Sequence, residues 1–149
     1  CPGEGIVASA TNDMPDNAFH ELLPFDVEAH IRDPETSMRK HLGNHVIIDH
    51  GNSEFSTVAH MRKGSVQANE SDKVEKGEKI GQVGTSGDSF FPHIHYQLQN
   101  GKSFLRSEGL PSRFEGFDLI IGRTTRRIED NCPNTGMIVR SANCIQKRK

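Results

Sequence analysis

The stretch GNHVIIDHGNSEFSTVAHM, residues 43–61, decides the fold of this chain. It holds two runs rich in apolar and β-branched residues, HVIID and FSTVAHM, which are separated by HGNS. Such runs are typical of β-strands, and Gly51 with Asn52 supplies residues that suit a tight turn. The stretch therefore predicts a β-hairpin.

Further short strands are predicted on both sides of this hairpin. One lies at Ile6–Ser9 upstream, and downstream candidates are GSVQA (64–68), KIGQV (79–83) and the segment that starts at residue 91. Four or five short strands joined by Gly-containing turns within roughly 60 residues indicate an antiparallel β-sandwich or a partly open barrel. Near the C-terminus, FDLII (117–121) is expected to form an edge strand and TGMIVRS another strand.

Two regions show little periodicity. Residues 11–42 carry scattered Pro, Asp and Asn, and we interpret them as a long insertion loop with a helical turn near DPETSMRKHL. In that turn Asp33 and Pro34 have the chemistry of a helix start. Residues 102–149 are interpreted as an irregular C-terminal extension, and 1–149 as a single domain by length.

Composition excludes several classes of function. Apolar residues make up 33% and aromatic residues 6% of the 149 residues, so a small core with extensive loops is expected. The formal net charge is −2 and no basic stripe is present, which argues against a nucleic-acid partner. The sequence has no apolar run long enough to span a bilayer and no signal peptide. Oligomeric state does not follow from these features.

The three cysteines are Cys1, Cys132 and Cys144. Cys132 and Cys144 could close one loop by a disulfide in an extracellular setting, which would leave Cys1 free. No two cysteines form a CxxC pair, so a thiolate zinc site or a redox centre is not expected.

The stretch FPHIHYQLQNG, residues 91–101, places two histidines one residue apart. Side chains alternate between the faces of a strand, so His93 and His95 would point the same way. Two imidazoles at one small volume suit a metal ligand beside a proton carrier. A lone His-x-His is more often an ordinary pair of surface or hydrogen-bonded histidines on a strand. The motif by itself does not decide between this interpretation and a metal site.

The order of five motifs adds a resemblance to a known family. The run GNHVIIDHGN, then STVAHM, GSV, DKVEKGEKIGQVGTSGDS and PHIHYQL, resembles the core of the lysostaphin-like zinc metalloendopeptidases. The resemblance is close over residues 43–99, and Gly5–Val7 fits the strand that precedes this core. It implies a mainly β fold with long loops, a twisted antiparallel sheet or β-sandwich of the duplicated-hybrid-motif (barrel-sandwich) type. It also implies hydrolysis of peptidoglycan peptides outside the cytoplasm.

The resemblance assigns roles to three histidines. It implies that His95 is a ligand of one zinc ion, that His93 is the catalytic histidine beside it, and that His60 is the other active-site histidine. Zinc with an open position lowers the pKa of bound water to about 7, which supplies hydroxide for attack on an amide. A histidine pair can then move the proton.

One family motif is missing from the expected place. Members of the family also use a His-x-x-x-Asp motif upstream of the strand that resembles Gly5–Val7, and here only three residues precede Glu4. The expectation is either an N-terminally truncated enzyme or a degenerate member that has lost the metal. His45 and Asp49 have the right spacing, but in an extended strand they would lie about 13 Å apart, too far to share one ion.

The sequence is also compatible with two other functions. A degenerate domain of the same fold could bind peptidoglycan or regulate an enzyme without cleaving. The segment DKVEKGEKIG is also similar to strands of biotinyl and lipoyl carriers, in which Lys73 would be the modified residue.

Overall fold

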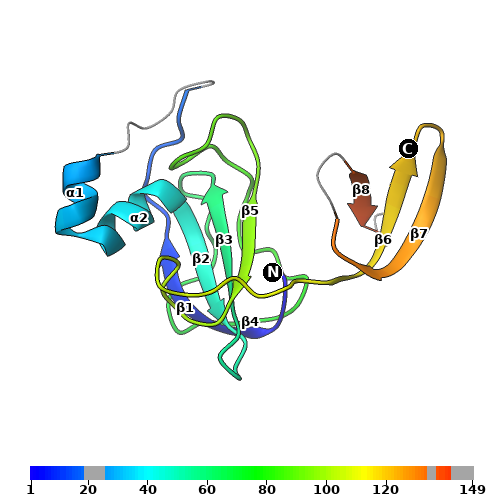
Figure 1. Ribbon diagram of the computed structural model, residues 1–149, viewed down its shortest axis with the longest axis horizontal. Coiled ribbons are helices and arrows are strands. Elements are labelled where there is room, and N and C mark those ends of the chain that lie inside the picture. Colours follow the sequence, from blue (N-terminus) through cyan, green and yellow to red (C-terminus); the bar gives the residue numbers. More distant parts are fainter. Residues whose placement is uncertain (19–25, 134–136, 142–149) are drawn as a thin grey trace. The chain divides into compact units, whose positions relative to one another are not determined.

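The computed structural model describes residues 1–18, 26–133 and 137–141, and its chain divides into two compact units, Cys1–Leu110 and Pro111–Lys149. The sequence had indicated one domain with an irregular extension. Figure 1 shows the strands and helices of each unit. No helix among the described residues is long and apolar enough to cross a membrane.

The first unit is built on a five-stranded antiparallel sheet, as the sequence predicted for a mainly β fold (Figure 1). Its strand order is β4-β1-β2-β3-β5. The predicted hairpin is present as its two central strands, β2 and β3. The strand bounds are β1 Gly5–Thr11, β2 Asn44–Asp49, β3 Phe55–Met61, β4 Lys73–Val74 and β5 His95–Gln99.

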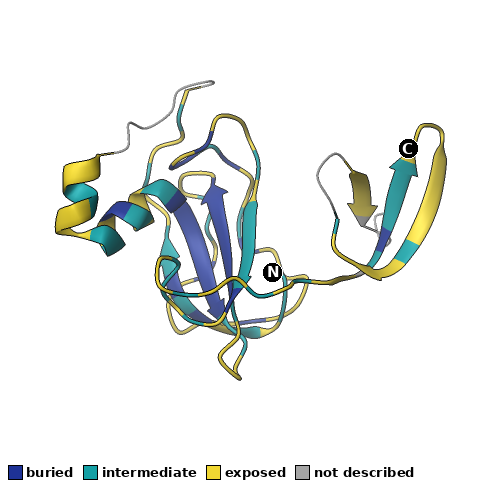
Figure 2. Cartoon of the chain, in the orientation of Figure 1, coloured by how far each residue is buried: buried dark blue, intermediate teal, exposed yellow. Residues whose placement is uncertain are grey.

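The hydrophobic core lies on one face of this sheet. Val46 and Ile48 of β2 are fully buried there and pack with Val58 and Met61 of β3. Alternation along β2 turns His45 and Ile47 to the opposite face, where they are buried as well. Figure 2 shows the resulting concentration of buried residues in β2 and β3. The central strands are thus covered on both faces, and β2 reads as an almost continuous apolar run for that reason.

Two of the predicted strands did not form. GSVQA and KIGQV are loop segments that make single hydrogen bonds, such as Gln67 N to Ile80 O at 3.0 Å and Arg62 N to Gln82 O at 2.9 Å. Ile80 is nevertheless buried in the core. The apolar pattern of these segments therefore reflects packing beneath the sheet and not a place in its hydrogen-bonded ladder.

The segment expected as a long loop contains two helices. They are α1, Val27–Arg32, and α2, Pro34–Leu42. The predicted helix start is confirmed, because the Asp33 side chain accepts a hydrogen bond from Thr36 N at 3.1 Å and Pro34 occupies the first turn. Asp33 also ends α1, since its N–H donates to Ala29 O.

The second unit is a three-stranded antiparallel sheet of order β7-β6-β8. Its strands are β6 Phe114–Ile121, β7 Thr124–Asn131 and β8 Ile138–Ser141. FDLII lies in β6, and the expectation of an edge strand was wrong, because β6 pairs with β7 on one side and with β8 on the other. The polar sequence of β7, TTRRIEDN, did not indicate a strand. The proposed Cys132–Cys144 bridge lies outside the described residues, which do not include Cys144.

Candidate active site

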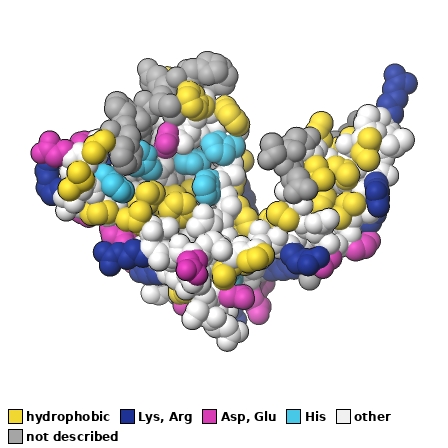
Figure 3. Space-filling model, viewed as in Figure 1, with side chains coloured by type: hydrophobic (Ala, Val, Ile, Leu, Met, Phe, Trp, Pro, Cys, Tyr) yellow, Lys and Arg dark blue, Asp and Glu magenta, His cyan; other side chains and the backbone are white. Residues whose placement is uncertain are grey.

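Three histidine rings from separate parts of the first unit lie together. The centroids of His60 and His93 are 4.8 Å apart, and those of His60 and His95 are 5.8 Å apart. Histidine side chains gather on the face of the first unit that Figure 3 presents. The structure therefore brings together all three histidines that the sequence singled out.

An irregularity in β3 turns His60 toward this cluster. Val58 and Met61 both belong to the core although they are three residues apart, so the alternation of side chains slips by one between them. His60 sits at the slip with φ of 60°. Positive φ is uncommon for a residue other than glycine and often marks a functional position. Without the slip, the His60 ring would share the core face with Val58.

His60 is held by the loop that follows KIGQV. Its Nδ1 lies 2.9 Å from the carbonyl oxygen of Ser86, and because a carbonyl can only accept, Nδ1 carries the proton. Nε2 is then the unprotonated nitrogen. Burial lowers the pKa of His60, while the bond to Ser86 opposes that shift. The ring is therefore neutral near pH 7, with a lone pair available for a proton.

His93 lies just before β5, where it forms an isolated bridge with Gly84. Gly84 N also donates to His60 O at 3.1 Å, so one glycine links the backbones of both histidines. The Nδ1 of His93 lies 2.9 Å from Phe91 O and 3.2 Å from Ser89 Oγ. As in His60, the contact with a carbonyl places the proton on Nδ1 and leaves Nε2 as the acceptor.

His95 is the first residue of β5 and pairs with Ala59 of β3. Its ring meets Phe104 edge-on, with centroids 5.6 Å apart. Burial lowers the pKa of His95, and neighbouring His93 lowers it further. A neutral imidazole beside an aromatic wall is the state in which histidine binds a metal ion.

Sequence reasoning missed the residues that support the cluster. Asp88 lies 3.7 Å from the Nδ1 of His41, at the end of α2, and its charge acts on His60 to raise that pKa slightly against burial. The backbones of Gly43 and Gly87 touch, because a Cβ on Gly87 would lie 2.4 Å from Gly43 N. The glycines of the loop GTSGD indicate that another backbone segment packs closely against this loop. The sequence does not show that this segment is the one at Gly43.

The described residues do not complete a metal site. No group of three or more His, Cys, Asp or Glu side chains among them is arranged to hold a metal ion. The alternative pair within β2 does not supply one, because Asp49 caps the turn by accepting from Gly51 N at 2.8 Å while His45 is buried in the sheet. His95 is thus one candidate nitrogen ligand without a full set.

The carrier hypothesis finds no support in the position of Lys73. This residue lies in β4, where it pairs with Ile6 of β1. The modified lysine of a carrier lies at an exposed hairpin tip, so this strand position does not suit it.

Comparison with known proteins gives a family match. Residues 31–106 match the model of Peptidase family M23, about half of the chain. Peptidoglycan DD-endopeptidase ShyA from Vibrio cholerae is 35% identical over 63 residues, which are 42% of this chain and 14% of ShyA. Peptidoglycan DD-endopeptidase ShyC from the same organism is 34% identical over 68 residues, which are 45% of this chain and 15% of ShyC.

The chain is also similar to a third curated protein and to a solved structure. An uncharacterised metalloprotease from Haemophilus influenzae is 36% identical over 62 residues, 41% of this chain and 13% of that protein. The chain thus spans a small share of the length of each curated relative. A mutant catalytic domain of the prophage-encoded M23 protein EnpA from Enterococcus faecalis superposes with a TM-score of 0.49 at 23% identity, covering 74% of this chain and 62% of that one.

Proposed function

The chain belongs to peptidase family M23, and from that membership we propose that it hydrolyses peptide bonds in bacterial peptidoglycan, outside the cytoplasm. The observation that carries the proposal is the histidine cluster. The ring centroids of His93 and His95 lie 4.8 Å and 5.8 Å from that of His60. Two relatives are described as peptidoglycan DD-endopeptidases, which supports the choice of substrate.

His60 and His93 are proposed as the catalytic proton carriers. In both, a carbonyl holds the Nδ1 proton and leaves the Nε2 lone pair available. Hydrolysis of an amide requires removal of a proton from water as it attacks the carbonyl carbon, and delivery of a proton to the nitrogen as the C–N bond breaks. Two histidine side chains side by side suit these two transfers, since imidazole titrates nearest neutral pH.

His95 is proposed as a zinc ligand. Family M23 generally uses zinc, which when bound polarises the scissile carbonyl and activates water. The described residues contribute one nitrogen from His95 and do not fit a complete zinc site.

The direct test is digestion of purified peptidoglycan sacculi, or of a synthetic cross-linked stem-peptide dimer, with added Zn²⁺. New amino and carboxyl termini in the soluble fragments, identified by mass spectrometry, are the expected result. A His93→Ala variant should still bind the sacculi but release fragments at least about a hundredfold more slowly. Equal release by the variant and the parent chain would reject the assignment of His93.

A second candidate function is favoured by the incomplete ligand set. The chain would then bind peptidoglycan, or a cell-wall enzyme, without cleaving it. Co-sedimentation with sacculi separates the two proposals. Binding with no fragments at any zinc concentration would support this module, and fragments that depend on His93 would exclude it.

A further inference from the structure

A β-bulge in β3 sets the direction of the His60 side chain. The register pairs Val46 with Val58 and then Asn44 with Met61, so one residue of β2 lies opposite two residues of β3. His60 is one of these two, with φ of 60°. Bulges often change the direction of a side chain next to an active site, and glycine commonly takes the left-handed position in them. A histidine in this conformation persists only where its surroundings fix it firmly.

Two buried side chains fix the backbone that follows His60. The carbonyl oxygen of Met61 accepts hydrogen bonds from Ser86 Oγ at 2.7 Å and from Asn44 Nδ2 at 3.1 Å. The carbonyl oxygen of His60 itself accepts from Gly84 N at 3.1 Å. Ser86 and Asn44 are both 0% exposed, so water does not compete for these bonds. Two successive carbonyl groups at the end of the bulge are therefore held in place.

The hydrogen bonds of both side chains are complete. Ser86 Oγ accepts from Asn44 N at 2.9 Å, while its single proton is donated to Met61 O. Asn44 Nδ2 donates its second proton to Met14 O at 2.8 Å, and Asn44 Oδ1 accepts from Met14 N at 2.9 Å. A buried polar network in which every proton has an acceptor favours one arrangement over the alternatives. The network thus specifies the backbone geometry at the bulge.

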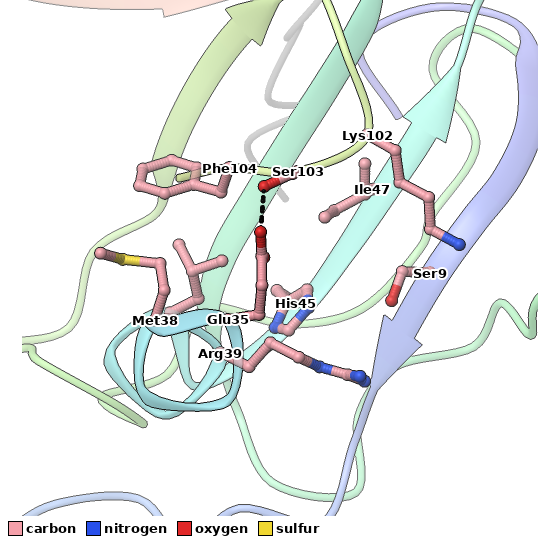
Figure 4. Close-up of a pocket in the computed structure, with 10 residues that line it drawn as sticks. Ser9, Glu35, Met38, Arg39, His45, Ile47, Lys102, Ser103 and Phe104 are labelled. Carbon is pink, nitrogen blue, oxygen red and sulfur yellow. Dashed lines mark hydrogen bonds between the residues drawn. The ribbon is translucent and has the colours of Figure 1, made fainter. Parts of the chain in front are cut away.

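The alternation of side chains along β2 directs Asn44 to this network. The next residue, His45, points to the opposite face, where it lines a cavity of about 290 Å³ between helix α2 and the sheet (Figure 4). Asn44 and Ser86 do not line that cavity. Their hydrogen bonds therefore act on the bulge and not on the cavity walls.

Ser86 also contacts the His60 ring directly. Its carbonyl oxygen lies 2.9 Å from Nδ1 of His60. The preceding residue, Thr85, is fixed by two bonds, because its N–H donates to Asp16 Oδ1 at 3.0 Å and its Oγ1 donates to Asn17 O at 3.0 Å. One residue, Ser86, thus contacts both the ring of His60 and the backbone that follows it.

We propose that Ser86 and Asn44 are positioning residues for His60, which hold the bulge through the carbonyl oxygen of Met61 and so keep the His60 ring in one place and in one tautomer. Neither side chain touches the substrate. The inference rests on the proposed function for the reaction in which His60 takes part. Its structural consequence, the single tautomer, does not depend on cleavage.

The first experiment determines the His60 tautomer in the whole chain without added metal, by long-range ¹H–¹⁵N correlation NMR of the imidazole rings. At about pH 8, above the ordinary histidine pKa, the parent chain should show a protonated Nδ1 and an unprotonated Nε2. Ser86→Ala removes the hydroxyl but keeps the carbonyl that Nδ1 contacts, and both tautomers should then be populated. A parent chain with mixed tautomers, or a variant with the single tautomer of the parent, would overturn the proposal.

Thr57→Val is the matched control, because it removes another fully buried hydroxyl from the same sheet. Thr57 lies in β3, and its Oγ1 donates to Gln99 Oε1 at 3.2 Å. This variant should keep the parent tautomer of His60, and mixed tautomers in both variants would show general loosening of the sheet and contradict the proposal. Should Ser86→Ala fail to fold, Ser86→Cys gives the same comparison, because it keeps the side chain with a weaker donor.

Cleavage of a synthetic stem-peptide dimer gives a second measurement. Ser86→Ala should lower kcat about tenfold to a hundredfold through misplacement of His60, with KM unchanged, since the buried hydroxyl does not reach the substrate. An unchanged kcat, or an equal loss in Thr57→Val, would refute the positioning role. A parent chain that cleaves nothing would reject the proposed function, and the tautomer of His60 would still decide whether Ser86 positions this ring.

Discussion

The rings of His60 and His93 lie 4.8 Å apart although one residue belongs to β3 and the other precedes β5. Gly84 joins their backbones, because it bridges to His93 and donates to His60 O. Each ring has its Nδ1 against a backbone carbonyl. The pair is thus set in position and in tautomer before any substrate arrives, which is the preorganisation that proton transfer requires.

Replacement of one histidine tests the catalytic assignment. His93→Ala should lower the rate of stem-peptide cleavage about a hundredfold to ten-thousandfold, the usual contribution of a general acid or base. The measurement is release of new amino termini from a synthetic stem-peptide dimer. His30→Ala, on α1 and outside the cluster, should retain the parent rate. A comparable loss in both variants would point to a general structural effect of removing a histidine.

Zinc binding should depend on His95. Elemental analysis of the chain after mild chelation and re-addition of Zn²⁺ gives the stoichiometry, and His95→Ala should not retain zinc, because it removes one of the proposed nitrogen ligands. About one zinc per parent chain, lost in the variant, is the outcome expected for an enzyme. No zinc in either protein would contradict the role proposed for His95 and favour the binding module.

Acid should destabilise the first unit through His45. Burial lowers the pKa of this side chain from its ordinary value of 6.5, so below that pH the unfolded chain binds a proton that the folded chain does not. The free energy of unfolding therefore falls as the pH drops from 6.5 toward the lower pKa of the folded state. His45→Phe, which cannot titrate, should show a shallower decline in urea unfolding between pH 7.5 and pH 5. Parallel curves for the two proteins would refute this account.

Gly84 should tolerate no side chain. A Cβ there would lie 2.3 Å from Arg62 N and 2.4 Å from its Cα, and both are backbone atoms that cannot move aside. Gly84→Ala should cost about 2–4 kcal/mol of unfolding free energy, in the range of overpacking and strain. Gly109→Ala is the matched control, because no atom of the described residues, apart from Gly109 itself and its two neighbours in the chain, lies within 4 Å of its Cβ position. A control loss as large as that of Gly84→Ala would contradict the steric explanation.

Local pattern was enough to predict part of the fold and of the candidate site. The apolar runs predicted β2 and β3, and Asp33 with Pro34 predicted the start of α2. These features depend on alternation, turn chemistry and capping, which act between residues close in the chain. GSVQA and KIGQV misled the prediction because packing into a core and pairing in a sheet require the same apolar residues.

The sequence by itself determined the hairpin, the mainly β class and the identity of the three histidines, since strand alternation and motif order are properties of the chain. Only the tertiary structure decided that His60 leaves the core face at a slip in β3, that Phe104 stands against His95, and that α2 encloses a cavity over His45. The physical reason is that these relationships join segments far apart in sequence. Their geometry follows from how the sheet and its covering segments pack, which no local pattern specifies.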